Sequence, residues 1–93
     1  MERIKICCIN YPNRDIDISV SPDTTILDIK NIYFQHENSH PEPKYQSYFY
    51  NGQLMNDSFT IDHILSNYSH VSPYQIIFHI IIEEVNEVST IKI

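Results

Sequence analysis

The first part of the chain alternates between apolar and polar side chains with a period of two. The apolar members are Ile4, Ile6 and Cys8 in the first segment, and Ile16, Ile18 and Val20 in the second. Between the two segments, the residues NYPNRD favour a turn. Since a strand with one buried face shows this period, we expect two strands, over 3–9 and 16–20, that pair as an antiparallel hairpin.

The apolar residues then change to a helical spacing. The apolar positions of this stretch, three and four residues apart, are Ile26, Ile29 and Tyr33. They share one face of a helix. Thr25 and Asp28 stand at its start in the arrangement of a capping box, with Asp in place of the more usual Glu or Gln. The pattern predicts a helix over 25–36 that lays its apolar face on the hairpin.

The stretch SYFYNGQLMND holds the single glycine of the chain. Its aromatic residues are typical of a strand, because they suit a pleated and half-buried surface. Asn51 and Gly52 tolerate the positive φ angles that a tight reversal needs. We therefore expect a hairpin-like turn, followed by a short strand around Leu54 and Met55 that returns the chain to apolar surroundings.

The remaining segments complete the order of elements. Pro41 and Pro43 predict an extended stretch after the helix, because proline interrupts hydrogen-bonded structure. Residues 60–65 suit a brief helical turn, and residues 66–73 suit a loop. Residues 76–82 are apolar at nearly every position, which is typical of a central strand. The chain therefore predicts an α+β domain with one helix packed across a mixed sheet of four to five strands.

Composition narrows the classes of partner and the location. Twelve acidic and six basic residues give a formal charge of −6 without a basic stripe, which argues against nucleic acid as a partner. The longest apolar run, residues 76–82, is interrupted by His79 and is much shorter than the roughly 20 residues of a membrane helix. The opening MERIKICCIN lacks the apolar core of a signal peptide. We expect a soluble cytoplasmic domain, alone or within a longer protein, with no membrane insertion by this segment.

No arrangement of reactive side chains predicts catalysis. Cys7 and Cys8 are adjacent in a strand, so their side chains point to opposite faces and do not bridge or chelate together. Cys7 also lacks a clear basic partner that would make it a nucleophile. His36 and His40 have the spacing of metal ligands but lie at a proline-flanked loop without further partners. We expect no enzyme activity, no metal site and no cofactor.

Several segments in register resemble the ubiquitin-like domain. VSPDTTILDIK resembles the family's passage from second strand to helix, and PEPKYQSYFYNGQLMND resembles its proline-led stretch, third strand and glycine turn. FTIDHI is similar to the Thr-Leu-x-Asp-Tyr element, and FHIII is similar to the last strand, with His79 at a family histidine position. The resemblance covers residues 3–82 and implies a β-grasp fold. We expect a ubiquitin-like domain at 1–83 and a C-terminal extension at 84–93.

One departure from the family concerns conjugation. Ubiquitin and its conjugated relatives end in a flexible Gly-Gly tail, whereas this chain continues as Glu83-Glu84-Val85 and shows no further glycine. Of the lysines that ubiquitin uses for chain building, only Lys30 has a counterpart here, and that position is mostly buried in the family. We therefore expect a domain that is not conjugated to other proteins.

The resemblance also implies a binding surface. Phe49 is expected to face outward from the third strand, and His79 and Ile81 are expected to face outward from the last strand. In the ubiquitin family the outward residues at such positions form an apolar patch that partners grip. The resemblance thus implies a partner site at Phe49, His79 and Ile81, with either Ile9 or Tyr11 from the first hairpin loop as a further member.

The surroundings of this site differ from those in ubiquitin. Ser47 and Gln53 stand where ubiquitin carries basic residues around its patch. Because the whole chain is acidic as well, we expect weaker electrostatic attraction to acidic partners than ubiquitin has.

Two groups of ubiquitin-like domains resemble these segments. The first group is the HERP-type domains of endoplasmic-reticulum membrane proteins that serve protein degradation. The second is the ubiquitin-like subunit that delivers tail-anchored proteins to that membrane. We expect a protein-interaction domain in quality control on the cytosolic face of the endoplasmic reticulum, with a degradation factor or a chaperone adaptor as its partner. The alternative is a structural domain that forms a homodimer when its tail, through Val88, Thr90 and Lys92, pairs along a sheet edge.

Overall fold

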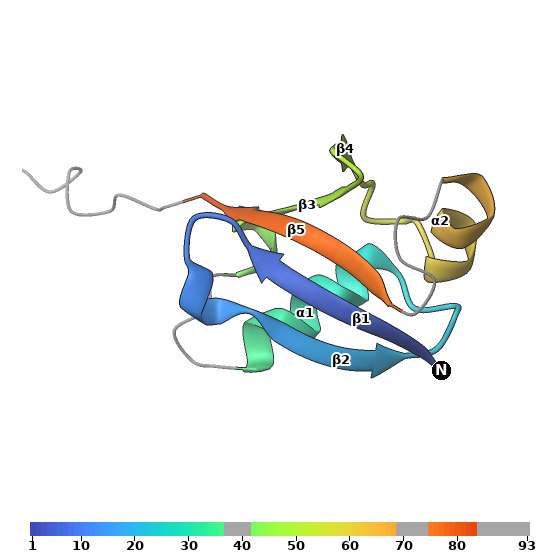
Figure 1. Cartoon of the computed structure of the whole chain (residues 1–93), viewed down its shortest axis with the longest axis horizontal. Helices are drawn as coiled ribbons and strands as arrows, with labels where there is room; N and C mark the ends of the chain where they lie inside the picture. The colour runs from blue at the N-terminus through green and yellow to red at the C-terminus, as the bar shows by residue number, and fades with distance from the viewer. Residues whose placement is uncertain (37–41, 69–74, 84–93) are drawn as a thin grey trace, which may run out of the picture.

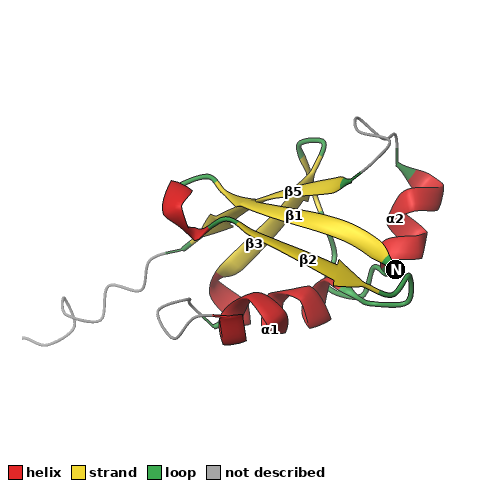
Figure 2. Cartoon of the chain, turned by 60° about the horizontal axis from the view of Figure 1, so that its bottom comes forward, coloured by secondary structure: helices red, strands yellow, loops and turns green. Residues whose placement is uncertain are grey.

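The computed structural model describes residues 1–36, 42–68 and 75–83. In chain order, its elements are β1 (Glu2–Cys8), the 3-10 turn η1 (Pro12–Arg14), β2 (Ile16–Val20), α1 (Ile26–His36), the 3-10 turn η2 (Pro43–Tyr45), β3 (Gln46–Tyr50), β4 (Gln53–Leu54), α2 (Ile61–Asn67) and β5 (Ile76–Ile82). The strands form one five-stranded sheet, and α1 crosses one face of it (Figure 1). A second view shows α1 beneath the sheet and α2 beyond the end at which β1 begins (Figure 2). The expected α+β architecture is confirmed.

The strand order of the sheet is β2-β1-β5-β3-β4. β1 pairs antiparallel with β2 and parallel with β5, while β3 pairs antiparallel with both β5 and β4. β5 is therefore the central strand, as its nearly continuous apolar sequence predicts. Residues far apart in the chain, such as Ile4 and Ile76, become register partners.

The inner face of the sheet and α1 share one core. Its fully buried side chains include Ile4, Ile6, Tyr48, Phe78 and Ile80 from the strands, and Ile26, Ile29 and Tyr33 from α1. The apolar positions predicted for the hairpin and the helix either belong to this core or pack against it. Burial of one such side chain contributes about 1.5–3 kcal/mol, so the alternating and helical patterns direct the packing.

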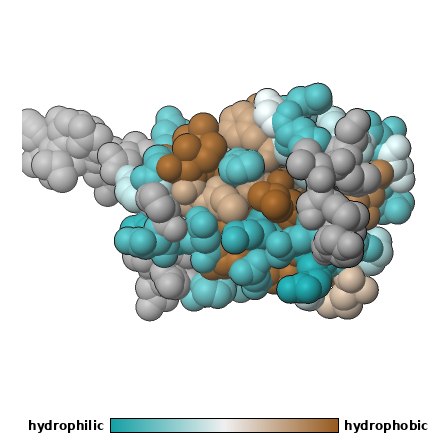
Figure 3. All heavy atoms as spheres, viewed as in Figure 1, coloured by the Kyte–Doolittle hydropathy of each residue, from teal (hydrophilic) through white to brown (hydrophobic). Residues whose placement is uncertain are grey.

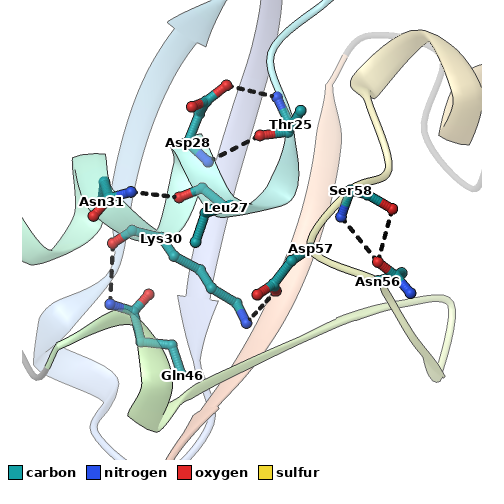
Figure 4. A network of polar contacts seen from close by, with 9 residues as sticks. All are labelled: Thr25, Leu27, Asp28, Lys30, Asn31, Gln46, Asn56, Asp57 and Ser58. Atoms are coloured by element: carbon teal, nitrogen blue, oxygen red, sulfur yellow. Dashed lines mark hydrogen bonds and ion pairs between the residues drawn. The ribbon is translucent and has the colours of Figure 1, made fainter.

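α1 begins at a reciprocal cap (Figure 4). Thr25 Oγ1 accepts a hydrogen bond from the Asp28 N–H at 3.1 Å, and Asp28 Oδ2 accepts one from the Thr25 N–H at 3.0 Å. The expected capping box is confirmed, because both bonds pair N–H groups that a helix start leaves open. Further along α1, Lys30 Nζ lies 2.6 Å from Asp57 Oδ1, and Gln46 Nε2 donates to the Lys30 carbonyl at 3.1 Å. These contacts join the helix to the β3 side of the molecule.

Asn51 and Gly52 form the turn between β3 and β4. Their φ angles are 51° and 78°, and two positive values are typical of a type I′ hairpin turn. The expected tight reversal is confirmed. The turn also sets the register of the hairpin, in which Phe49 lies opposite Leu54.

The sequence predicts that both Leu54 and Met55 lie in apolar surroundings, and for Leu54 this prediction is wrong. Met55 is buried, but Leu54 is 63% exposed and does not return to apolar surroundings. The physical reason is the register: directly paired residues share a face, so Leu54 stands on the outward side with Phe49 while α1 covers the inward side. One residue later the chain turns into the core, and the Met55 N–H donates to the Tyr48 carbonyl at 2.9 Å.

The second helix is longer than the brief turn that the sequence predicts. It continues to Asn67, into the stretch expected as a loop, and it gives the sheet a second helix where one was expected. Thr60 Oγ1 caps its start by accepting from the His63 N–H at 3.0 Å. Ile61 and Ile64, one turn apart, anchor the helix in the core.

Part of the proline stretch and of the tail lies outside the described residues. Pro43 begins the 3-10 turn η2, so this part of the stretch is not fully extended. Pro41, His40 and the C-terminal extension 84–93 fall outside the described ranges, and their predictions stay predictions.

Candidate functional site

The outward face of the sheet brings together side chains from neighbouring strands. In the register of β3 and β5, Phe49 lies opposite His79 and Ser47 lies opposite Ile81. The residues between them point into the core, so these four side chains stand on the face away from α1. His79 is exposed, Ile81 is 42% exposed and Phe49 is half-buried. The structure therefore joins Phe49, His79 and Ile81 on one surface.

The two loop candidates occupy different places. Ile9 is 56% exposed, and its N–H donates to the Ile80 carbonyl at 2.9 Å, which places Ile9 beside Ile81. Tyr11 instead packs partly against the core, with the Arg14 guanidinium 4.9 Å from the centre of its ring. The structure thus places Ile9, rather than Tyr11, next to the other predicted site residues.

Leu54 adds to this surface, although the sequence reasoning missed it. It is the register partner of Phe49 and is among the most exposed large apolar side chains of the described residues. The signal that reveals it is the Asn51-Gly52 turn, because a two-residue loop pairs the residue two before it with the residue two after it. We call Ile9, Phe49, Leu54, His79 and Ile81 the sheet patch. Figure 3 shows hydrophobic side chains gathered over this face of the sheet, interspersed with hydrophilic ones.

The surroundings of the sheet patch carry little net charge. Ser47, the register partner of Ile81, borders it on β3 as an uncharged side chain. Gln53, which was expected beside the patch, is instead the register partner of the inward-facing Tyr50 and stands on the other face of the hairpin. On the β1 and β2 side, Lys5 and Asp17 are register partners, so their opposite charges lie together. The patch therefore offers apolar contact area rather than a strong electrostatic field.

A cysteine lies beside the sheet patch. Cys7 is the register partner of His79, so a thiol and an imidazole are neighbours across β1 and β5. Burial raises the pKa of the Cys7 thiol, Asp15 adds to this effect, and Lys5 opposes it. Because the thiolate is the nucleophilic form, a raised pKa keeps Cys7 as a protonated and weakly reactive thiol at neutral pH. This pair supplies no activated nucleophile.

The described part of the chain offers neither a metal-binding cluster nor a membrane-spanning helix. Within residues 1–36, 42–68 and 75–83, no group of three or more His, Cys, Asp and Glu side chains is arranged to hold a metal ion. No helix in this part of the chain combines the length and the apolar character that crossing a bilayer requires.

Other exposed apolar side chains lie on the outer face of α1. They are Leu27, Ile32 and Phe34. Leu27 and Phe34 are two turns apart on one side of the helix, and Ile32 lies on a different side. Because these side chains are spread along and around the helix, they resemble the scattered apolar residues of ordinary protein surfaces.

Comparisons with known proteins agree with this geometry. The sequence model of the Ubiquitin family matches residues 4–76. The structure is similar to the solved structure of ubiquitin from Caldiarchaeum subterraneum, with a TM-score of 0.74 and 18% sequence identity over 91% of this chain and 96% of that chain. A comparison with curated protein sequences found no significant match. The fold is the ubiquitin-like β-grasp, and the chain belongs to the ubiquitin family.

Proposed function

We propose that this chain is a non-conjugated ubiquitin-like domain that binds a protein partner through the sheet patch. The observation that carries the proposal is a row of apolar side chains that runs from Ile9 through Ile81 and Phe49 to Leu54. Soluble domains seldom leave large apolar side chains clustered in water unless another molecule covers them. The patch is therefore the part of the described surface best suited to a partner.

The dimensions of the row suit a short partner segment. Neighbouring strands are about 4.8 Å apart, so a row across four strand positions spans on the order of 14 Å. Three turns of an α-helix cover a similar length, and an amphipathic helix presents apolar side chains every three or four residues. One face of such a helix matches the row from Ile9 to Leu54.

Phe49 is the proposed energetic centre of the contact. Its direct register partners are Leu54 on β4 and His79 on β5, and Ile81 lies two residues further along β5 on the same face. The residues on either side of Phe49 in β3 are buried. Aromatic residues at the centre of an interface commonly carry most of the binding energy. Because the strand is already ordered, the domain loses little conformational entropy when it binds. A contact of this small size is expected to be transient, with micromolar affinity.

The chemistry of the chain supports a binding role over conjugation or catalysis. The ubiquitin-like fold serves modifiers and interaction modules, and Cys7 is a weakly reactive thiol. After β5 the chain continues through Glu83 without a further glycine in the printed sequence. These observations support a ubiquitin-like interaction domain at 1–83, followed by a separate extension at 84–93.

The proposed setting is ubiquitin-dependent protein quality control at the cytosolic face of the endoplasmic reticulum. Its support is the resemblance of PEPKYQSYFYNGQLMND and IIFHIII to HERP-type domains. The partner would be a degradation factor of the ubiquitin pathway, or a chaperone adaptor if the resemblance to the tail-anchored delivery subunit is the relevant one. Self-association through the tail is not part of this proposal, because residues 84–93 lie outside the described structure.

A matched pair of phenylalanine variants tests the binding surface. Phe49→Ala should lose the partner that the wild type recovers from cell extract, since removal of a central aromatic anchor commonly costs about 2 kcal/mol, or roughly 30-fold in Kd. Phe34→Ala removes an equally large side chain that is 36% exposed on the outer face of α1. This control should bind like the wild type.

The possible results of this experiment test the binding surface and the cellular setting separately. Circular dichroism and thermal unfolding must first show that Phe49→Ala is folded. A folded Phe49→Ala protein that binds as tightly as the wild type would mean that the sheet patch is not the site. Recovery of nuclear or ribosomal machinery through Phe49 would retain the binding surface and remove the endoplasmic-reticulum setting.

A further inference from the structure

The main-chain ladder between β1 and β5 ends in an unusual way. The Ile9 N–H donates to the Ile80 carbonyl at 2.9 Å, which continues the parallel pattern one residue beyond β1. In the next step of such a ladder, the Ile9 carbonyl would accept from the Ile82 N–H. Here the side chain of Asn10 takes that place: Asn10 Oδ1 accepts from the Ile82 N–H at 3.1 Å.

The side-chain amide of Asn10 also forms a hydrogen bond with the main-chain carbonyl of Ile82. Asn10 Nδ2 donates to the Ile82 carbonyl at 2.7 Å. A carboxamide has one acceptor and one donor side by side, as a peptide group does, so the Asn10 side chain acts as a strand-like partner for the end of β5. The Cys8 thiol is also within hydrogen-bond distance of Asn10 Oδ1, at 3.6 Å.

Other contacts fasten the far end of the same loop. The Cys8 N–H donates to Asp15 Oδ1 at 2.9 Å, and the Tyr33 hydroxyl donates to the Arg14 carbonyl at 2.8 Å. The loop is therefore bonded to the sheet at its start and to α1 near its end. Ile9 is the exposed apolar residue between the last ladder bond and the Asn10 amide.

We propose that Asn10 is a positioning residue that holds Ile9 beside Ile81 and so prepares the β1 side of the sheet patch before a partner arrives. A side chain that is already in its bound place loses less conformational entropy on binding. The consequence for binding rests on the proposed function, whereas the placement of Ile9 is a property of the unbound domain.

The unbound domain gives the first test, in which NMR compares Asn10→Ala with the wild type. Amide exchange at Ile82 should accelerate by about tenfold, because its N–H loses the Asn10 acceptor. The methyl order parameters of Ile9 should fall, and the nuclear Overhauser contacts between the Ile9 and Ile81 methyl groups should weaken.

Asn31→Ala is the control for these measurements. It removes another side-chain amide that bonds to a main-chain carbonyl, from Asn31 Nδ2 to Leu27 at 3.1 Å on α1. It should leave Ile9 and Ile82 unchanged. Wild-type exchange at Ile82 and wild-type order at Ile9 in the Asn10→Ala protein would overturn the proposal, since the Ile9 carbonyl would then have closed the ladder without the amide.

A double-mutant cycle tests how Asn10 acts on binding. The probe is the partner that the wild type captures and Phe49→Ala loses. Asn10→Ala should raise Kd about fivefold, and Ile9→Ala with Asn10→Ala should raise it no more than Ile9→Ala alone, because Asn10 acts through Ile9. Additive losses would overturn the positioning role. Failure of the proposed function is seen separately, as unchanged binding by Phe49→Ala, and the exchange and methyl measurements then decide the role of Asn10 on their own.

Discussion

Tyr48 places a phenol hydroxyl in the centre of the core. Its ring packs edge-on against Phe78, with 5.9 Å between the ring centres. Among the described residues, no group forms a hydrogen bond with the Tyr48 hydroxyl. Burial raises the pKa of Tyr48, so the hydroxyl is protonated at neutral pH. A buried polar group without a partner costs about 1–3 kcal/mol relative to its hydrated state.

Removal of this hydroxyl should stabilise the domain. We expect Tyr48→Phe to raise the free energy of unfolding by about 1 kcal/mol. The substitution keeps the aromatic ring and removes only the hydroxyl that has no hydrogen-bond partner among the described residues. Urea denaturation at 25 °C measures the change. Tyr33→Phe is the matched control and should lower the free energy of unfolding by a similar amount, since the Tyr33 hydroxyl donates to the Arg14 carbonyl at 2.8 Å. A loss of stability in Tyr48→Phe would contradict the prediction and show that its hydroxyl is hydrogen-bonded in solution.

Among the elements, the β3–β4 hairpin links the sequence to the sheet patch most directly. Its turn keeps Asn51 and Gly52 at positive φ, and the resulting register holds Leu54 opposite Phe49. A Cβ atom added at Gly52 would meet nothing within 4 Å. Any cost of a side chain there comes from the backbone conformation alone.

Two substitutions at Gly52 should therefore differ in their effect on stability according to how well each new residue tolerates a positive φ angle. Gly52→Ala should lower the free energy of unfolding by about 1 kcal/mol, because an alanine disfavours positive φ. Gly52→Asn should cost less, since Asn tolerates the left-handed region better than other residues with a side chain. Thermal unfolding of both variants measures the order. Two variants as stable as the wild type would show that the turn in solution has another conformation.

At the scale of the whole molecule, β1 and β5 lie side by side at the centre of the sheet, and the chain leaves the sheet after Ile82. The Glu83 N–H donates to the Tyr45 carbonyl at 2.8 Å, so the first residue beyond β5 is still bonded to the domain. The residues that follow in the printed sequence are a mixture of acidic, uncharged polar and apolar residues with one lysine, and they include no glycine.

The chain should accordingly fail as a substrate for conjugation. Incubation with ubiquitin-activating enzyme and ATP should give no thioester, because residues with side chains replace the glycines of the tail. Ubiquitin under the same conditions serves as the positive control, and non-reducing electrophoresis detects the adduct. A thioester formed through the C-terminus of this chain would refute the non-conjugated role.

The sequence by itself determined most of the elements and most of their faces, although it predicted α2 only as a brief turn. Alternation identified the buried sides of β1 and β2, the Thr25 and Asp28 pair identified the start of α1, and Asn51-Gly52 identified the hairpin. These features depend on interactions within a few residues of the chain, which local sequence controls directly. The outward positions of Phe49, His79 and Ile81 followed from the same period of two.

Only the tertiary structure decided which other residues join the sheet patch. Ile9 rather than Tyr11 lies beside Ile81, because the end of β5 bonds to Ile9 and to the Asn10 amide from far along the chain. Leu54 is exposed because α1 covers just one face of the sheet and no described residue covers the other. The Asn51-Gly52 turn sets the face on which Leu54 stands, but whether that face is covered depends on where α1 packs. The placement of Ile9 and of α1 depends on contacts between distant segments, which a local pattern of apolar and polar residues does not specify.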